Sequence, residues 1–129
     1  MALGTDIIEV DRIRRAAEKH PRFWQRILTE KEERYCRAAS DGIHCLAGRF
    51  AAKEAVMKAL GTGMNQLNFN EIEILNDATG RPVVCPGPAL ERVMALQRIR
   101  RIEVSISHCK AYATAVAWAR TAEAAADQG

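Results

Sequence analysis

The sequence has 129 residues, 48% hydrophobic and 27% charged, which is the composition of one folded globular domain and not of a disordered or fibrous chain. Its net charge of +3, from 19 basic and 16 acidic residues mixed along the chain, favours an anionic ligand only weakly and does not imply nucleic-acid binding. No stretch approaches the roughly 18 apolar residues of a membrane-spanning helix, and no secretory leader is evident, so we expect a cytoplasmic protein without membrane association.

The first predicted element is a strand over residues 3–10, in which apolar and β-branched side chains surround a single early acid, Asp6. Three helices should follow, over residues 10–20, 21–28 and 29–39. The third opens on a capping box, because the Thr29 hydroxyl can accept from the Glu32 amide while Glu32 reaches back. The next helix should run from about residue 43 to residue 60, with Gly61 as its natural C-terminal residue.

The second half of the chain should begin with a hairpin, because residues 69–75 alternate strictly and residues 81–85 can return after the turn at 76–80. A helix over 89–99 and two antiparallel strands over 102–108 and 111–119 complete the order. This order predicts an α+β fold, with a mixed or antiparallel sheet packed against a long central helix. We expect one domain over residues 1–120 and a flexible C-terminal tail over 121–129.

The four cysteines show no CxxC pair and no zinc-like spacing; they are Cys36, Cys45, Cys85 and Cys109. Without a sign of an oxidising compartment, we interpret all four as reduced thiols.

Two acidic residues stand where apolar residues are expected. Glu54 falls on the same face of the 43–60 helix as Phe50 and Met57, and Asp6 interrupts the first strand. A solvated Glu54–Lys58 pair and a turn-capping Asp6 are the plain alternatives. However, a carboxylate on a half-buried face must be paired or hold a metal, and two such acids suggest one shared Mg²⁺, which takes few protein ligands and completes its shell with water and phosphate.

Other candidates are less specific. Arg49 lies some 140° around the helix from Glu54, so it should serve a different ligand. The turn Gly61-Thr62-Gly63 allows close backbone approach to a phosphate, although such a sequence is more often only a helix stop. His108 ends a strand on its apolar face and is by default a packed core or edge histidine. His20 and His44 have no comparable setting.

Five segments together resemble one family, the holo-[acyl-carrier-protein] synthases, which are the small group of 4'-phosphopantetheinyl transferases. The segments are GTDIIEVDRI (4–13), RFWQRILTEKE (22–32), AGRFAAKEAVMKALGTG (47–63), FNEIEILNDATGRP (69–82) and SISHCKAYATAVA (105–117). The resemblance covers nearly the whole chain in the right order. It implies the family fold, transfer of 4'-phosphopantetheine from coenzyme A to a serine of apo acyl carrier protein, Mg²⁺ dependence, release of adenosine 3',5'-bisphosphate, and a role in fatty acid biosynthesis.

The resemblance also implies residue roles. Asp6 and Glu54 would hold Mg²⁺, and Lys58 would contact the coenzyme A diphosphate and assist proton transfer. The coenzyme site would further include Arg49, Gly61, Thr62, Gly63 and His108, with Arg49 and His108 reaching the 3'-phosphate partly across a subunit boundary. Carrier-protein docking would fall to Arg12, Arg22, Phe23 and Arg26. The resemblance implies a homotrimer with three sites at its interfaces.

Two alternatives stay open at this point. A non-catalytic phosphate- or nucleotide-binding module would use the same basic residues without transferring a group. An RNA-binding α+β domain fits the element types, but aromatic residues are only 5% of the chain and no stacked aromatic pair is evident on the strands. The preferred carrier protein, the use of acyl-coenzyme A, the general base and the tightness of the oligomer are not indicated by the sequence.

Overall fold

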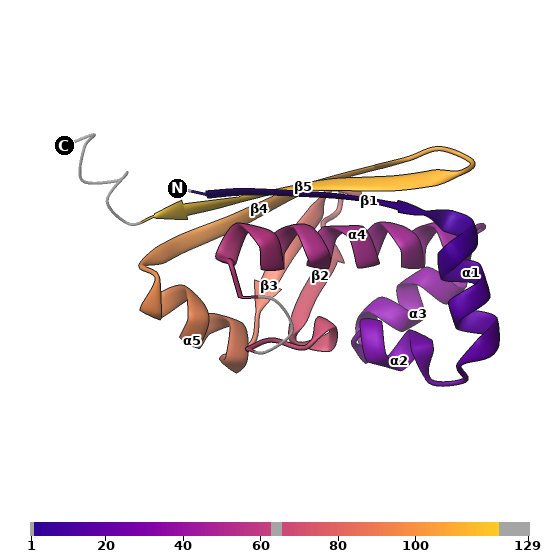
Figure 1. Cartoon of the computed structure of the whole chain (residues 1–129), viewed down its shortest axis with the longest axis horizontal. Coiled ribbons are helices and arrows are strands. Elements are labelled where there is room, and N and C mark those ends of the chain that lie inside the picture. Colours follow the sequence, from indigo (N-terminus) through magenta and orange to yellow (C-terminus); the bar gives the residue numbers. More distant parts are fainter. Residues whose placement is uncertain (1, 63–65, 122–129) are drawn as a thin grey trace.

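The longest helix, α4 (Gly42–Leu60), lies along one face of a three-stranded sheet (Figure 1). The computed structural model describes residues 2–62 and 66–121. The sheet has the order β1-β5-β4 and is antiparallel throughout; its strands are β1 (Ala2–Glu9), β4 (Ile99–His108) and β5 (Tyr112–Thr121). The central strand is therefore the last one in the chain, and the N-terminal strand pairs with it.

Small residues bring α4 close to this sheet. Four successive inward positions of β5 are alanine and buried: Ala113, Ala115, Ala117 and Ala119. On β1, a Cβ added at Gly4 would lie 2.0 Å from the carbonyl oxygen of Ala55 and 2.6 Å from the amide nitrogen of Ala59. Only glycine fits there, because backbone atoms of α4 occupy the space a side chain would need.

The hairpin forms a second sheet of its own and does not join the first. It consists of β2 (Ile72–Asn76) and β3 (Pro82–Pro86), paired antiparallel. The antiparallel sheet packed against the long helix is as predicted, and the hairpin stands apart from it. The reason is chemical: prolines begin and end β3, so neither of these positions has an N–H to donate to a further strand, and β3 stays an edge.

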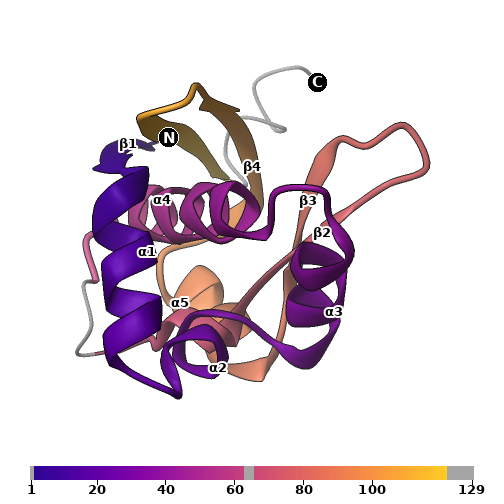
Figure 2. The same ribbon diagram turned by 90° about the vertical axis from the view of Figure 1, so that its right-hand side faces the viewer.

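Three short helices pack at one end of α4, and a fourth packs at the other (Figures 1 and 2). These helices are α1 (Val10–Lys19), α2 (Phe23–Ile27), α3 (Glu30–Ala38) and α5 (Pro88–Leu96). The predicted capping box at Thr29 is present, with the Glu32 side chain accepting from the Thr29 amide at 3.0 Å. Gly61 ends α4 in the left-handed conformation, at φ 68°, as predicted.

Two boundaries differ from expectation. Residues predicted to begin the strand at 69 instead form a 3₁₀ turn, η2 (Phe69–Glu71), because Asn68 and Glu71 make a capping box that closes it. Helix α5 ends at Leu96 and not at residue 99, where β4 already begins. The Gln97 side chain donates to the carbonyl oxygen of Leu60 at 2.7 Å and so ties the end of α5 to the end of α4.

The interpretation of four reduced thiols was wrong for one pair. Cys36, buried near the end of α3, forms a disulfide with Cys45 in the first turn of α4, while Cys85 and Cys109 are free. The tight connection between the two helices brings the Cα atoms to 5.3 Å, within the usual range for a bridge. A spacing of nine residues across a helix–turn–helix is not a sequence motif, so the sequence alone does not indicate this bridge.

The predicted domain boundary falls near the end of the last strand, which runs through Thr121. The rest of the predicted tail, 122–129, lies outside the described residues. Within residues 2–62 and 66–121, none of the helices has the length and apolar character needed to cross a membrane.

Candidate active site

Asp6 and Lys58 meet where β1 crosses α4. Because side chains alternate along a strand, Asp6 lies on the same face of β1 as Gly4 and so points toward the helix that Gly4 admits. The Lys58 ammonium donates to Asp6 Oδ1 at 3.0 Å and to the carbonyl oxygen of Thr5 at 3.1 Å. The Asp6 side chain is 14% exposed and that of Lys58 53%, so the pair lies at the rim of the core and is open to a ligand.

Glu54 joins this pair from one turn earlier in α4. Partial burial raises the pKa of Glu54 above its usual value, the negative charge of Asp6 raises it further, and the positive charge of Lys58 lowers it in part. Two carboxylates therefore act on one another beside a single ammonium group. A cation placed between them would relieve this repulsion.

The donor set fits a hard divalent ion with few protein ligands. Among the described residues, no group of three or more His, Cys, Asp or Glu side chains is arranged to hold a metal. Asp6 and Glu54 together supply two carboxylates, which matches the way Mg²⁺ binds when water and substrate phosphate complete its shell. A zinc or calcium site would need more protein ligands than these two residues provide.

Arg49 and His108 line a separate cavity of about 340 Å³ beside α4. Arg49 is 5% exposed; its Nη2 donates to the amide oxygen of Asn76, and its guanidinium carbon lies 5.3 Å from the centroid of the Tyr35 ring. His108 is an exposed residue at the end of the edge strand β4, so it is an edge histidine and not a core one. The structure thus brings together the two residues that the resemblance assigned to one phosphate.

The same cavity contains His44, for which the sequence indicates no role. The His44 ring lies 5.3 Å from that of His108, and its Nδ1 is 2.5 Å from Asp41 Oδ2. The hydrogen bond to Asp41 raises the pKa of His44. One part of this arrangement is local in sequence, because Asp41 is the N-cap of α4 and lies three residues before His44. The other part is a tertiary contact that the sequence does not show: the β4–β5 turn places the Lys110 carbonyl oxygen 3.0 Å from His44 Nε2.

The glycine-rich turn closes α4. The Gly61 amide donates to the carbonyl oxygen of Lys58 and the Thr62 amide to that of Met57, both at 3.2 Å, so neither amide is left free for a phosphate. Gly61 is exposed, with nothing within 4 Å of an added Cβ. A ligand could therefore approach the backbone of this turn without meeting a side chain. Gly63 lies outside the described residues.

Two of the predicted docking residues, Phe23 and Arg26, line a cavity of about 560 Å³ at the α1–α2 corner. The floor of this cavity is aromatic, because Phe50 of α4 and Phe69 stack there with ring centroids 5.0 Å apart. The other two, Arg12 and Arg22, are exposed on and between these helices, outside the cavity lining.

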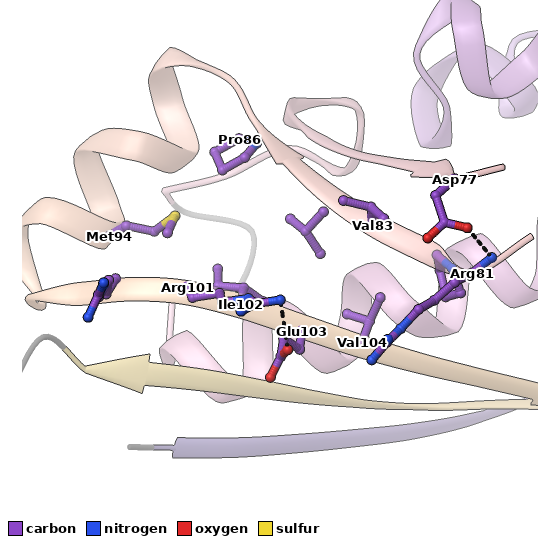
Figure 3. A pocket seen from close by; sticks show the side chains of 12 residues that line it. Asp77, Arg81, Val83, Pro86, Met94, Arg101, Ile102, Glu103 and Val104 are labelled. Atoms are coloured by element: carbon purple, nitrogen blue, oxygen red, sulfur yellow. Dashed lines mark hydrogen bonds and ion pairs between the residues drawn. The ribbon is translucent and has the colours of Figure 1, made fainter. Parts of the chain in front are cut away.

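A further cavity, of about 310 Å³, lies between β4 and the edge strand β3 (Figure 3). Its charged side chains include pairs such as Arg101 and Glu103, whose Nη2 and Oε1 atoms are 3.1 Å apart. None of the residues predicted for catalysis, coenzyme binding or docking lines it.

Comparison with known proteins gives one consistent result. Residues 2–117 match the family described as the 4'-phosphopantetheinyl transferase superfamily. A holo-[acyl-carrier-protein] synthase from Chlamydia muridarum is 50% identical over 117 residues, covering 89% of this chain and 90% of that protein. The corresponding protein from Protochlamydia amoebophila is 46% identical over 119 residues, covering 91% and 95%.

Solved structures agree. The crystal structure of holo-[acyl-carrier-protein] synthase from Neisseria meningitidis superposes with a TM-score of 0.87 at 38% identity, covering 93% of this chain and 98% of that one. The Helicobacter pylori enzyme in complex with coenzyme A gives 0.80 at 29% identity, covering 91% and 98%. The chain therefore belongs to the 4'-phosphopantetheinyl transferase superfamily, and within it to the holo-[acyl-carrier-protein] synthases.

Proposed function

We propose that Asp6, Glu54 and Lys58 form the centre at which this enzyme transfers 4'-phosphopantetheine from coenzyme A to a serine of apo acyl carrier protein, with Mg²⁺ and with release of adenosine 3',5'-bisphosphate. The observation that carries the proposal is the convergence of two carboxylates and one lysine at the β1–α4 contact. In the reaction, the serine oxygen bonds to the phosphorus that carries the pantetheine, the bond from that phosphorus to the bridging oxygen breaks, and the serine proton passes to water or to a nearby carboxylate.

The chain's own groups would act mainly by position and charge, as in phosphoryl transfer generally. Asp6 and Glu54 would hold the ion, which when bound supplies positive charge to the diphosphate oxygens. Lys58 is half-exposed and reaches Asp6 through a flexible stem, so its ammonium can turn from Asp6 to a phosphate oxygen. Thr114 donates to the Asp6 carbonyl oxygen at 2.8 Å and fixes the strand from the other side.

The coenzyme's nucleotide would lie in the cavity of Arg49 and His108. Arg49 precedes Glu54 by five residues, roughly 7.5 Å along the helix axis, on another face of α4. With Arg49 and His108 reaching the nucleotide partly across a subunit boundary, one coenzyme would lie against two protomers. Gly61, Thr62 and Gly63 would border the same coenzyme, since the exposed end of α4 presents no bulky side chain at Gly61.

We further propose that the active form is a homotrimer. The outer face of the β1-β5-β4 sheet, away from α4, exposes large apolar residues: Leu3 at 68%, Ile7 at 65%, Val116 at 44% and Trp118 at 37%. Leu3 and Trp118 are direct cross-strand neighbours, so this outer sheet face is contiguous. A patch of this kind is typical of a subunit interface.

The carrier protein would dock at the α1–α2 corner. Phe23 offers an apolar contact beside the Phe50–Phe69 stack, and Arg26 lies at the same cavity. Arg12 and Arg22 add exposed positive charge nearby. An acidic helix with an apolar edge would be complementary to this surface. A cytoplasmic location stays a prediction.

The decisive experiment is mass spectrometry of an apo acyl carrier protein incubated with the enzyme, coenzyme A and Mg²⁺. A mass gain of one phosphopantetheine group is expected, and it should disappear with chelator or with Glu54→Gln. The matched control is Glu91→Gln on the exposed face of α5, which should modify the carrier as the unaltered enzyme does. Binding of coenzyme A without a mass gain would favour the non-catalytic module, and full activity of Glu54→Gln would refute the metal assignment.

A further inference from the structure

A buried charge cluster lies directly behind Arg49. Glu32 of α3 and Lys53 of α4 are both fully buried, with no solvent exposure. Lys53 Nζ donates to Glu32 Oε1 at 2.6 Å and to the carbonyl oxygen of Ile27 at 2.5 Å. Burial of two charges is costly, and an ion pair of this kind is often no more stabilising than apolar residues of similar size. The pair therefore calls for a reason other than stability.

The Glu32 carboxylate contacts four residues, which belong to the start of its own helix, to α4 and to β2. Its Oε1 accepts from Lys53 and from the Thr29 amide, and its Oε2 accepts from the Ile74 amide of β2 at 3.1 Å. Oε2 also lies 3.5 Å from Arg49 Nε, an ion pair between side chains that are 0% and 6% exposed. Because both oxygens are already engaged, Glu32 cannot turn to grip the guanidinium through two parallel hydrogen bonds.

This arrangement leaves the outer edge of the guanidinium available. Glu32 faces only Nε, Asn76 accepts from Nη2, and the Tyr35 ring lies 5.3 Å away. The cluster holds two positive charges, on Arg49 and Lys53; Glu32 pairs with both, and the negative charge of Glu73 also acts on Lys53. In the part of the chain that the structure describes, Glu32 is the only carboxylate in an ion pair with Arg49. The guanidinium of Arg49, paired with a carboxylate only at Nε, therefore lines the cavity shared with His108.

We infer that Glu32, fixed by Lys53, is a positioning residue that holds Arg49 toward the coenzyme's ribose phosphate, so that preference for coenzyme A over 3'-dephospho-coenzyme A depends on Glu32. The inference rests on the proposed function, in which Arg49 binds that phosphate. Lys53 occupies Oε1 and keeps Glu32 from rotating. Without the carboxylate, the guanidinium loses its ion pair at Nε, and its outer edge is no longer held toward the cavity.

The test compares kcat/KM for coenzyme A and for 3'-dephospho-coenzyme A in the full-length enzyme. Glu32→Gln keeps the side-chain volume and removes the charge; we expect a fall of at least about tenfold with coenzyme A and little change with the dephospho compound, since a charge-assisted contact to phosphate is lost. The matched control is Glu33→Gln on the same helix, where Glu33 pairs with Arg37 at the surface at 2.8 Å. This control should keep the wild-type preference.

Arg49→Ala separates the inference from the proposed function. If Arg49→Ala abolishes the preference but Glu32→Gln slows both coenzymes equally, Glu32 is only structural and the inference is overturned. If Arg49→Ala leaves the preference intact, the proposed phosphate role of Arg49 fails instead. Should Glu32→Gln not fold, the double variant Glu32→Gln/Lys53→Met leaves no unpaired lysine buried. Selective loss with coenzyme A in that variant supports the inference, and equal loss with both coenzymes overturns it.

Discussion

Lys58 and Asp6 form an ion pair across the contact between α4 and β1, with 3.0 Å between Nζ and Oδ1. The pair exists because the strand and the helix touch backbone to backbone at Gly4, two residues before Asp6 on the same face. The geometry of the site therefore depends on a residue that carries no chemistry of its own.

Gly4→Ala should destabilise the fold and impair activity together. The added Cβ would lie 2.0 Å from the Ala55 carbonyl oxygen, so α4 must move away from β1, and overpacking of this kind costs about 1–3 kcal/mol or more. Thermal unfolding followed by circular dichroism measures the loss. Gly87→Ala is the control, because nothing lies within 4 Å of an added Cβ there and its φ is −92°. Equal unfolding temperatures for the two variants would contradict the explanation.

Glu54→Gln should stabilise the metal-free protein at neutral pH while abolishing turnover. The pKa of Glu54 is raised above 4.5 in the folded state, mainly by burial and then by Asp6, so the folded protein holds this proton more tightly than the unfolded chain. The stability from that proton is present below pH 4.5 and is lost as pH rises through the folded-state pKa. Glutamine does not ionise, so the Glu54→Gln variant does not lose this stability as pH rises.

The measurement is the free energy of unfolding from urea titrations between pH 4 and 8 without Mg²⁺. The advantage of Glu54→Gln should grow with pH and then level off. Mg²⁺ should reduce this difference in the free energy of unfolding, because the ion stabilises the folded unaltered protein, which keeps the Glu54 carboxylate. An advantage that shrinks as pH rises would contradict the assigned sign.

The sequence predicted the elements that local rules control. The capping box at Thr29 and the glycine end of α4 are short-range features and were confirmed. The alternation at 69–75 predicted a strand from residue 69, but the first three residues form a 3₁₀ turn that depends on the side-chain cap at Asn68. His44 was missed because its cavity forms only when the β4–β5 turn reaches the start of α4.

The buried cluster shows a second limit. Lys53 stands in a helix between alanines and another charge, and nothing in the sequence separates it from a solvated lysine. Its full burial follows from the packing of α3 against α4, and burial lowers its pKa to about 8 despite the attraction of Glu32. By contrast, Asp6 and Glu54 could be singled out, because each interrupts an apolar face that the local pattern already defines.

A reductant should lower the unfolding temperature of protein purified in air. The Cys36–Cys45 bridge closes a loop with a sequence separation of nine residues, and the chain-entropy account gives roughly 2–3 kcal/mol for a loop of this size. Dithiothreitol should lower the unfolding temperature of the unaltered protein and of the Cys85→Ser/Cys109→Ser variant. It should leave that of the Cys36→Ala/Cys45→Ala variant unchanged. If alkylation without reductant labels all four cysteines, the bridge does not form in solution.

Ile7→Asp should break the homotrimer and abolish transfer. Ile7 lies 65% exposed on the outer sheet face, so a buried charge there would oppose association. Light scattering coupled to size-exclusion chromatography gives the mass of the assembly. Leu96→Asp on α5 is the control, since Leu96 is an exposed leucine, at 85%, that lies away from this sheet. A trimeric Ile7→Asp variant, or an active monomer, would contradict the proposed interface.

Arg26→Glu should raise the KM for apo acyl carrier protein and leave the KM for coenzyme A unchanged. Arg26 lines the cavity at the α1–α2 corner, whose lining includes none of Asp6, Glu54 and Lys58, so the reversed charge should repel an acidic carrier and leave the proposed metal ligands in place. The rate of the unaltered enzyme at low carrier concentration should fall as salt rises, because exposed charges are screened within about 10 Å at 0.1 M salt. Arg92→Glu, exposed on α5, is the matched charge reversal and should leave both KM values unchanged. If Arg92→Glu weakens carrier binding as much as Arg26→Glu does, net charge and not the α1–α2 corner governs docking.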